Sequence, residues 1–329
     1  MKKRLFAITA ILLILAFTIT GCNSTKQISD DKKTDNITVR IADQPQYFPT
    51  KIADELGYFK DEFQKDGITI ELKSFISGPP MIESFASGAV DLGILGDQPT
   101  IQARSNNIDL KVISTFCTAE RGYGFIATQA SGIHNLKDIK GKKIGVPIGT
   151  TGHQLLLLML ESVGIKENEV KIVNLSQADA SAALKSNSID GAVLSEPTVT
   201  AVKKFGCKEI IDGSSFKQIV CVVAGRNEFL KENPKIAARI LKVLDKAAKW
   251  SNENEKAAVE LVSKATNTPK ESESNLYKGR DNAITLNDKY IKSIEDTAKF
   301  LKEHDVINTD VKIGDIIDSS YFKAAGITK

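Results

Sequence analysis

The chain has 329 residues, of which 42% are hydrophobic and 26% charged, and its formal net charge is +3. Lys2, Lys3 and Arg4 account for this excess because residues 1–21 contain no acid, so the rest of the chain is close to neutral. A neutral chain lacks the basic surface that binding to a phosphate backbone requires, which argues against a nucleic acid as partner.

Residues 1–22 have the pattern of an export signal. Basic residues precede an uncharged apolar run over residues 5–18, and the segment ends in Ile19-Thr20-Gly21-Cys22. The run is shorter than the roughly 20 residues that span a bilayer, which makes an uncleaved membrane anchor the weaker alternative. The last four residues resemble the lipoprotein box of bacterial surface proteins. That resemblance implies removal of a signal peptide, residues 1–21, and lipidation of Cys22, with palmitate in the anchor, on the extracytoplasmic face of the cell membrane.

A polar segment follows. Residues 23–36 contain one apolar side chain, Ile28, and are otherwise mostly Ser, Thr, Lys, Asp and Asn, so residues 22–36 are predicted to be a flexible tether. About 290 residues remain beyond it, which is enough for two compact lobes.

Strands and helices are predicted to alternate from residue 37 onward. Ile37, Val39 and Ile41 alternate as in a strand, and residues 52–59 have helical spacing. Further strands are expected at 68–72, 90–95, 110–116, 124–128, 143–146, 170–175, 191–194, 209–211 and 219–224, with helices at 81–87, 151–163, 178–185 and 197–205. Beyond residue 226 the pattern is helical, near 234–252, 255–264, 271–278 and 288–303, without further strands. This order predicts an α/β fold with largely parallel sheets.

Part of the first half is repeated in the second. Residues 87–99 align with residues 186–197, and each copy runs from a helix through a turn and a buried strand to an acid before a proline. In open α/β sheets, ligands bind outside the carboxyl ends of the strands. Asp97 and Glu196 are therefore candidates to face a cleft between two similar lobes. Alternatively, each acid caps the helix that follows it, and the two roles can coexist.

Two turns precede predicted helices. Gly149-Thr150-Thr151-Gly152-His153 opens an apolar helix, and Ser77-Gly78-Pro79-Pro80 is its counterpart in the first half. Glycines allow close backbone approach, and a helix start presents free N–H groups and partial positive charge, which together suit a small oxyanion. The second-half turn lacks the lysine of a nucleotide-binding loop. A plain connection is the alternative for either turn.

With Gly96-Asp97-Gln98-Pro99 and Glu196-Pro197, these turns resemble the aliphatic sulfonate, taurine and nitrate binding proteins of ABC importers. The resemblance covers residues 37–322 and is strongest up to Pro197. It implies a type II periplasmic-binding-protein fold, in which two α/β lobes enclose a ligand by hinge closure and a helical C-terminal segment joins the first lobe. The lobes would comprise residues 37–126 with 225–329, and residues 127–224, with crossings near 126–129 and 221–225.

The resemblance also implies a function. The protein would be an extracytoplasmic solute-binding lipoprotein, acting as a monomer without cofactor or metal. It would capture a small anionic or zwitterionic ligand, such as a sulfonate, taurine, nitrate or bicarbonate, and deliver it to an ABC permease and its ATPase.

Carried over by position, the implied ligand-binding residues share a place at the ends of strands or the starts of helices. They are Gln44, Ser77, Gly78, Asp97 and Gln98 in the first lobe, and Gly149, Thr150, Thr151, Gly152 and Glu196 in the second. His153 contacts the ligand or packs on the first helical turn. Arg121 offers a planar cation to a carboxylate or sulfonate, or pairs with Glu120.

One position departs from the family pattern. Ser195-Glu196 stands where the sulfonate binders usually place an aromatic residue and an aspartate, which puts a long-alkyl sulfonate in doubt. An acid near the far end of a ligand suits an ammonium group, as in taurine.

Other function classes remain as alternatives. A binder of a thiamine-pyrimidine precursor, or an enzyme, can share the fold. The three histidines, His134, His153 and His304, form no metal or nucleophile motif, which argues against an enzyme. The paired helix-start turns argue against a structural or adhesive surface protein, which would need no cleft.

Three cysteines follow Cys22. Cys117, Cys207 and Cys221 have neither the spacing of a zinc site nor the even number of a disulfide framework. Cys207 and Cys221 pair, or these cysteines are buried as small apolar residues.

Overall fold

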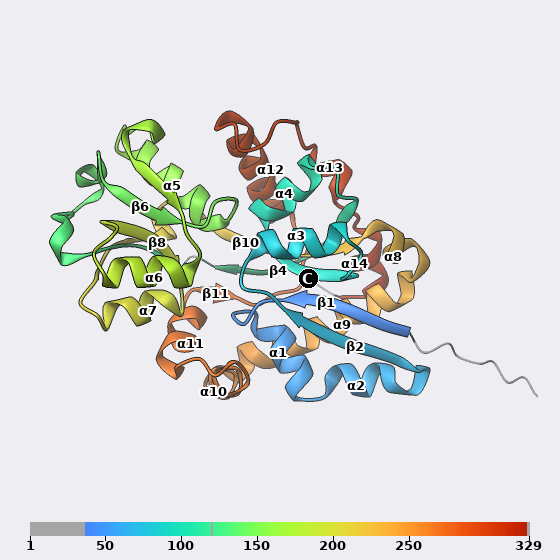
Figure 1. The fold of residues 1–329 in the computed structure, drawn as a ribbon. Helices are drawn as coiled ribbons and strands as arrows, with labels where there is room; N and C mark the ends of the chain where they lie inside the picture. Colours follow the sequence, from blue (N-terminus) through green and yellow to red (C-terminus); the bar gives the residue numbers. More distant parts are fainter. Residues whose placement is uncertain (1–36, 120, 328–329) are drawn as a thin grey trace, which may run out of the picture. The chain divides into compact units, whose positions relative to one another are not determined.

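The computed structural model describes residues 37–119 and 121–327, so the predicted signal peptide, the tether, Cys22 and Glu120 lie outside the described residues. Within the described ranges the chain forms two α/β lobes, each built around its own sheet (Figure 1). The predicted α/β class is therefore confirmed. Every described helix is too short or too polar to cross a membrane.

The first lobe contains a six-stranded sheet in the order β11-β4-β10-β3-β1-β2. β2, β1 and β3 are parallel, whereas β10 runs antiparallel to both β3 and β4. Its elements before the second lobe are β1 (Ile37–Asp43), α1 (Phe48–Glu55), α2 (Tyr58–Phe63), η1 (Gln64–Asp66), β2 (Ile68–Ser74), α3 (Gly78–Ala86), β3 (Leu92–Gly96), α4 (Asp97–Ser105) and β4 (Leu110–Ala119). Those after it are β10 (Ile219–Arg226), α8 (Asn227–Glu232), α9 (Pro234–Glu253), α10 (Glu255–Thr266), α11 (Lys270–Tyr277), β11 (Arg280–Asp281), α12 (Asp288–Glu303), α13 (Ile313–Ile316) and α14 (Ser320–Ala325).

The second lobe contains a five-stranded sheet in the order β7-β6-β8-β5-β9. Its elements are β5 (Tyr123–Ala127), η2 (Gln129–Ser131), η3 (Leu136–Ile139), β6 (Lys143–Val146), α5 (Thr151–Ser162), η4 (Glu167–Glu169), β7 (Lys171–Asn174), α6 (Gln177–Lys185), β8 (Gly191–Ser195), α7 (Thr198–Lys203), β9 (Lys208–Asp212) and η5 (Gly213–Ser215).

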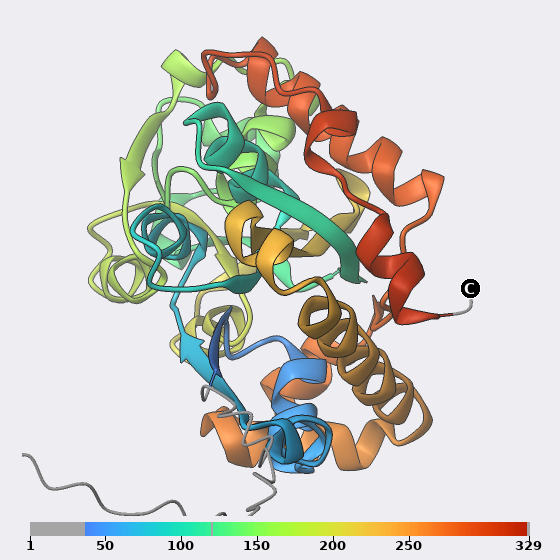
Figure 2. The ribbon, with the colours of Figure 1, turned by 90° about the vertical axis from the view of Figure 1, so that its right-hand side faces the viewer.

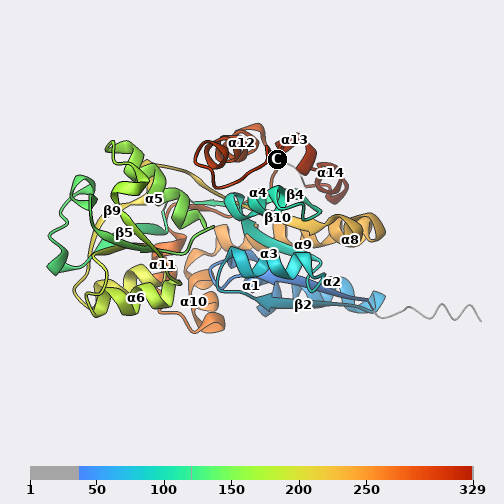
Figure 3. The same cartoon turned by 45° about the horizontal axis from the view of Figure 1, so that its top comes forward.

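Helices cover both faces of the first sheet (Figures 2 and 3). Apolar side chains of α3, α4, α12 and α13 pack on one face, and those of α1, α2, α9 and α10 pack on the other. The 20-residue α9 shows how the sequence encodes this packing: Ile236, Ile240 and Leu244 recur at a spacing of four and are all buried. β3 is buried along its whole length, which agrees with its unbroken run of apolar and glycine residues.

The crossings between the sheets lie earlier in the chain than predicted. β4 belongs to the first sheet and β5 to the second, so the chain leaves the first lobe between Ala119 and Tyr123 and returns between Asp212 and Ile219. The expected boundaries at 126/127 and 224/225 fall inside β5 and β10. An apolar strand indicates burial, but its sequence does not specify the sheet with which it pairs.

The prediction of no strand beyond residue 226 is wrong at one place. β11 has only two residues, Arg280 and Asp281, which pair with Ala119 and Thr118 at the edge of the first sheet. A strand of two residues is too short to show an alternating pattern.

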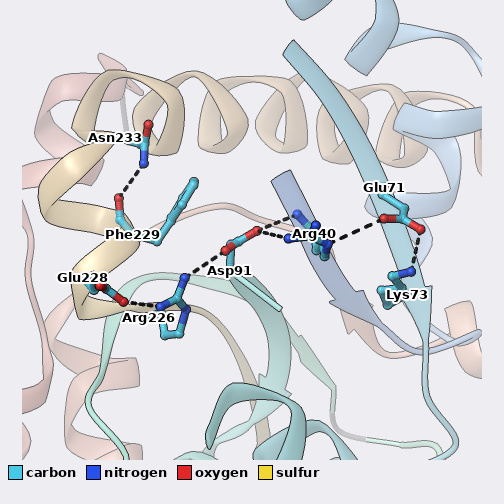
Figure 4. Close-up of polar contacts among 8 residues, drawn as sticks. All are labelled: Arg40, Glu71, Lys73, Asp91, Arg226, Glu228, Phe229 and Asn233. Carbon is cyan, nitrogen blue, oxygen red and sulfur yellow. Dashed lines mark hydrogen bonds and ion pairs between the residues drawn. The ribbon is translucent and has the colours of Figure 1, made fainter. Parts of the chain in front are cut away.

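The internal repeat has a structural role that is the same in each lobe. Asp91 accepts a hydrogen bond from the backbone N–H of Arg40 at 2.9 Å, and Asp190 accepts one from the backbone N–H of Lys143 at 2.8 Å. Each aspartate precedes a central strand and ties it to the neighbouring strand. Figure 4 shows Asp91 in this position, where Arg226 of β10 also contacts its carboxylate at 3.1 Å.

A buried ion pair fixes the return crossing to the first lobe. Lys217 lies between η5 and β10, and its ammonium group pairs with the carboxylate of Asp97 at the start of α4. The Thr297 hydroxyl of α12 contacts both, at 2.6 Å from Lys217 Nζ and 2.8 Å from Asp97 Oδ2. The side chains of Lys217 and Asp97 are 7% and 0% exposed, so water contributes little to solvating either charge.

The variant Lys217→Met is expected to destabilise the protein. It leaves the buried Asp97 carboxylate without a counter-charge, which costs about 3–5 kcal/mol in the free energy of unfolding. Urea unfolding measures the effect. The matched control is Lys292→Met, which breaks an exposed pair with Asp296 four residues away on α12 and should leave the midpoint almost unchanged. Equal midpoints for the two variants would contradict a stabilising role for the buried pair.

Candidate ligand-binding cleft

A cavity of about 280 Å³ lies between the two lobes. The first crossing contributes Arg121 and Gly122 to its wall, and the start of β10, directly after the return crossing, contributes Ile219. The first lobe adds Gln44, Tyr47, Ser77, Gly78, Gly96, Pro99, Cys221 and Arg280, and the second adds Tyr123, Thr150, Thr151, Gln177, Ser195 and Glu196, among others. The carboxyl ends of β1, β3 and β8 all lead into this wall, as the rule for open α/β sheets predicts.

Seven of the predicted site residues line the cavity and five do not. Gln44, Ser77, Gly78, Arg121, Thr150, Thr151 and Glu196 are in the wall. Asp97, Gln98, Gly149, Gly152 and His153 are not part of it.

Asp97 and Gln98 lie behind the wall. The Asp97 carboxylate is engaged by Lys217 and Thr297 and also accepts a hydrogen bond from the backbone N–H of Gln98 at 2.8 Å. Gln98 is fully buried, and neither atom of its side-chain amide has a hydrogen-bond partner among the described residues. The sequence predicted that Asp97, an acid at the end of a strand, faces the ligand. In the structure its carboxylate instead stabilises the fold.

The remaining three residues shape the start of α5. Gly149 has a φ of +79°, which favours glycine, and a Cβ atom there would lie 3.0 Å from the Gln102 side chain. Gly152 packs beside the ring of Tyr123. His153 is 6% exposed, and burial lowers the pKa of its imidazole, so its packing on the first turn is observed.

The start of α5 faces the cavity through two hydroxyl-bearing residues. Thr150 is the N-cap residue, and its hydroxyl accepts the N–H of His153 at 3.4 Å and donates to the carbonyl of Pro147 at 2.7 Å. Thr151 follows, with its hydroxyl hydrogen-bonded to that of Tyr123, whose pKa is raised by burial. The first N–H groups of a helix lack intrahelical partners and carry partial positive charge, so this end of the cavity suits an anion.

The start of α3 offers fewer hydrogen-bond donors than the start of α5, its counterpart in the sequence. Ser77 occupies the N-cap position without a side-chain capping bond, and the prolines at residues 79 and 80 have no N–H. Packing also requires glycine at position 78, because a Cβ atom there would lie 2.7 Å from Pro99.

The cavity contains a cation that the sequence pattern did not reveal. Arg280, on β11, donates a hydrogen bond from Nη1 to the backbone carbonyl of Gln46, and its buried Nε has no partner among the described residues. No described carboxylate lies within ion-pair distance of its guanidinium group, although four other arginines of the first lobe have such partners, namely Arg40, Arg104, Arg226 and Arg239. A guanidinium with no ion-pair partner among the described residues favours an anionic ligand.

The acid of the second lobe sits at another part of the same wall. Glu196 is 8% exposed, and its carboxylate accepts hydrogen bonds from the backbone N–H and the hydroxyl of Thr200, at 3.2 and 2.9 Å. Burial raises the pKa of this carboxyl group. The expected helix-capping role is thus observed, and the same side chain remains in the cavity wall.

Comparison with known proteins places the chain in a family. Residues 44–258 match the model of the family described as NMT1/THI5 like. A protein of Bacillus subtilis named "Putative aliphatic sulfonates-binding protein" is 32% identical over 99% of this chain and 97% of its own length. The taurine-binding periplasmic protein of Escherichia coli is 28% identical over 81% of this chain and 87% of its own length.

A solved structure shows the fold. The periplasmic aliphatic sulphonate binding protein SsuA from Escherichia coli superposes with a TM-score of 0.75 at 22% identity, covering 87% of this chain and 99% of that protein. The predicted type II periplasmic-binding-protein fold is confirmed, and the chain belongs to the NMT1/THI5-like family.

Proposed function

We propose that this protein is the extracytoplasmic solute-binding component of an ABC importer and that its ligand is a small sulfonate. The observation that carries the proposal is the meeting of the Arg280 guanidinium and the start of α5 in one cavity lined by both lobes. The names of the relatives from Bacillus subtilis and Escherichia coli, an aliphatic sulfonates-binding and a taurine-binding protein, support it.

Capture occurs by closure of the two lobes. Arg280 belongs to the first lobe and Thr151 to the second, so an anion that contacts both stabilises the arrangement in which they face each other. Gly96 of β3 leaves room for this approach, because a Cβ atom there would lie 2.9 Å from the Thr151 hydroxyl oxygen. The ligand-loaded protein then docks on a permease, whose ATPase drives uptake.

The ligand carries an amine at its other end. The Glu196 carboxylate is the acid of the second-lobe wall, and a zwitterion such as taurine would bring its ammonium group there while its sulfonate meets Arg280. Thermal unfolding with taurine, ethanesulfonate, nitrate, bicarbonate and a thiamine-pyrimidine precursor tests this choice. Taurine at 100 times its Kd should add about 2.7 kcal/mol to the free energy of unfolding. No shift with any of these compounds, in protein stripped of co-purified ligand, would contradict the proposal.

The variant Arg280→Gln is expected to weaken sulfonate binding. Removing the guanidinium deletes a charge-assisted hydrogen bond, which corresponds to a loss of about 10- to 100-fold in affinity. Isothermal titration calorimetry with taurine and ethanesulfonate measures the change. The matched control is Arg40→Gln, since Arg40 contacts Glu71 and Asp91 away from the cavity. Equal affinities for the two variants would show that Arg280 does not contribute to sulfonate binding.

The variant Glu196→Gln is expected to separate the two ligands. Taurine, which has the ammonium group, should lose about tenfold in affinity, and ethanesulfonate, which lacks it, should lose little. Because burial raises the pKa of Glu196, acidification should weaken taurine binding at a higher pH than an exposed glutamate would give. Parallel titrations of both ligands against pH provide the measurement. A similar loss for both ligands would show that Glu196 acts only through Thr200.

Anchoring through lipid on Cys22 completes the proposed role. In the native host, the wild-type protein should partition into detergent with the membrane fraction, and Cys22→Ala should appear in the aqueous fraction. Intact-mass analysis gives an independent readout of the attached lipid. An unmodified Cys22 in membrane-derived protein would refute the anchor without affecting the binding site.

A further inference from the structure

Cys221, in the wall of the cavity, has a second cysteine as its neighbour in the first sheet. Cys117 on β4 and Cys221 on β10 are direct partners in the antiparallel register. Residues in that relation point to the same face of the sheet, with Cα atoms about 4.5–5.5 Å apart. A disulfide requires a Cα separation of about 4.4–6.8 Å, a range that includes the usual separation of such cross-strand partners. The register of the two strands shifts only after this pair, between Cys221 and Val222.

The surroundings of the pair favour reaction between the two sulfurs. The neighbouring Cys221 thiol lowers the pKa of Cys117, and the nearby Arg280 charge acts in the same direction against the effect of burial. Cys117 and burial raise the pKa of Cys221, whose thiol also contacts the Tyr47 hydroxyl at 3.8 Å.

Access is through the cavity. Cys221 is one of the residues that line it, whereas Cys117 lies beneath, with 1% of its surface exposed. A small neutral molecule entering the cavity reaches Cys221 first, with Cys117 behind it.

The third described cysteine is elsewhere. Cys207 lies in the second lobe among Val199, Val202 and Leu184, and all three thiols are free in this structure. The alternative in which Cys207 and Cys221 pair is therefore wrong, because the two residues belong to the cores of different lobes. The alternative, burial as small apolar residues, is what the structure has.

We propose that Cys117 and Cys221 form a redox-active dithiol that diamide, a neutral azodicarboxamide, converts into a disulfide across β4 and β10. The Cys221 sulfur adds to one nitrogen of the N=N bond, and its proton moves to the other nitrogen. The Cys117 sulfur then attacks the Cys221 sulfur, the S–N bond breaks, and the Cys117 proton passes to the departing nitrogen. Two thiols lose two electrons in total, and the azo group gains them to become a hydrazine.

The position of this pair gives the bond a mechanical consequence. Cys117 lies two residues before the end of β4, and Cys221 two residues after the start of β10, so the disulfide would join the bases of the two crossings. The pairing itself does not depend on the proposed function. Export would place the dithiol where disulfides persist.

The test has two arms that use the full chain. Native protein is treated with diamide, and in parallel urea-denatured, reduced protein is refolded in a glutathione redox buffer. Remaining thiols are then alkylated under denaturing conditions and the peptides are mapped without reduction. Both arms should yield a cross-linked peptide pair containing Cys117 and Cys221, lighter than the two reduced peptides by two hydrogen atoms and separated by dithiothreitol.

Variants define the outcome. Cys117→Ser and Cys221→Ser should each abolish the cross-linked peptide pair, and the matched control Cys207→Ser should retain it. Full alkylation of both cysteines in both arms, or a bridge to Cys207, would overturn the proposal. A disulfide that forms during refolding but not in native protein treated with diamide would contradict oxidation of the pair through the cavity.

Discussion

The buried ion pair between Lys217 and Asp97 is the interaction on which the cavity depends. Two lobes joined by short crossings keep a defined cavity only if the crossings are fixed to a core. Lys217 belongs to the return crossing, and Asp97 and Thr297 hold its ammonium group against α4 and α12 of the first lobe. Ile219 and Cys221 follow directly and form part of the cavity wall. Both charges are almost fully buried, so water contributes little to solvating either of them if the pair separates. The pair therefore holds this segment against the first lobe.

The charges in the cavity wall have a different status. The Asp97 carboxylate is neutralised behind the wall, whereas the Arg280 guanidinium has no described carboxylate within ion-pair distance, and the α5 helix start adds partial positive charge to the same wall. An anionic ligand would supply the ion-pair partner that no described carboxylate provides. This asymmetry gives a physical reason why a sulfonate would be bound in the proposed function, and the separate position of Glu196 accounts for the proposed amine.

Much of the fold could be predicted from the sequence, because apolar periodicity and turn residues report local structure directly. The alignment of residues 87–99 with residues 186–197 is visible in the sequence, and the structure gives Asp91 and Asp190, one from each copy, the same role at a strand entrance. The crossings were misplaced because an apolar strand has the same pattern in either sheet. An acid before a helix has the same sequence whether it faces a cavity or, like Asp97, pairs with a lysine 120 residues further along the chain. Arg280 could not be found, because a two-residue strand has no periodicity and its position beside Gln46 is set by tertiary packing alone.

A crystal structure of the protein with bound taurine tests the central claim most directly. The account predicts sulfonate oxygens within hydrogen-bond distance of the Arg280 guanidinium and of the backbone N–H groups at the start of α5, with the ammonium group directed toward Glu196. A sulfonate bound elsewhere on the protein, or bound in the cavity without contact to Arg280, would contradict it.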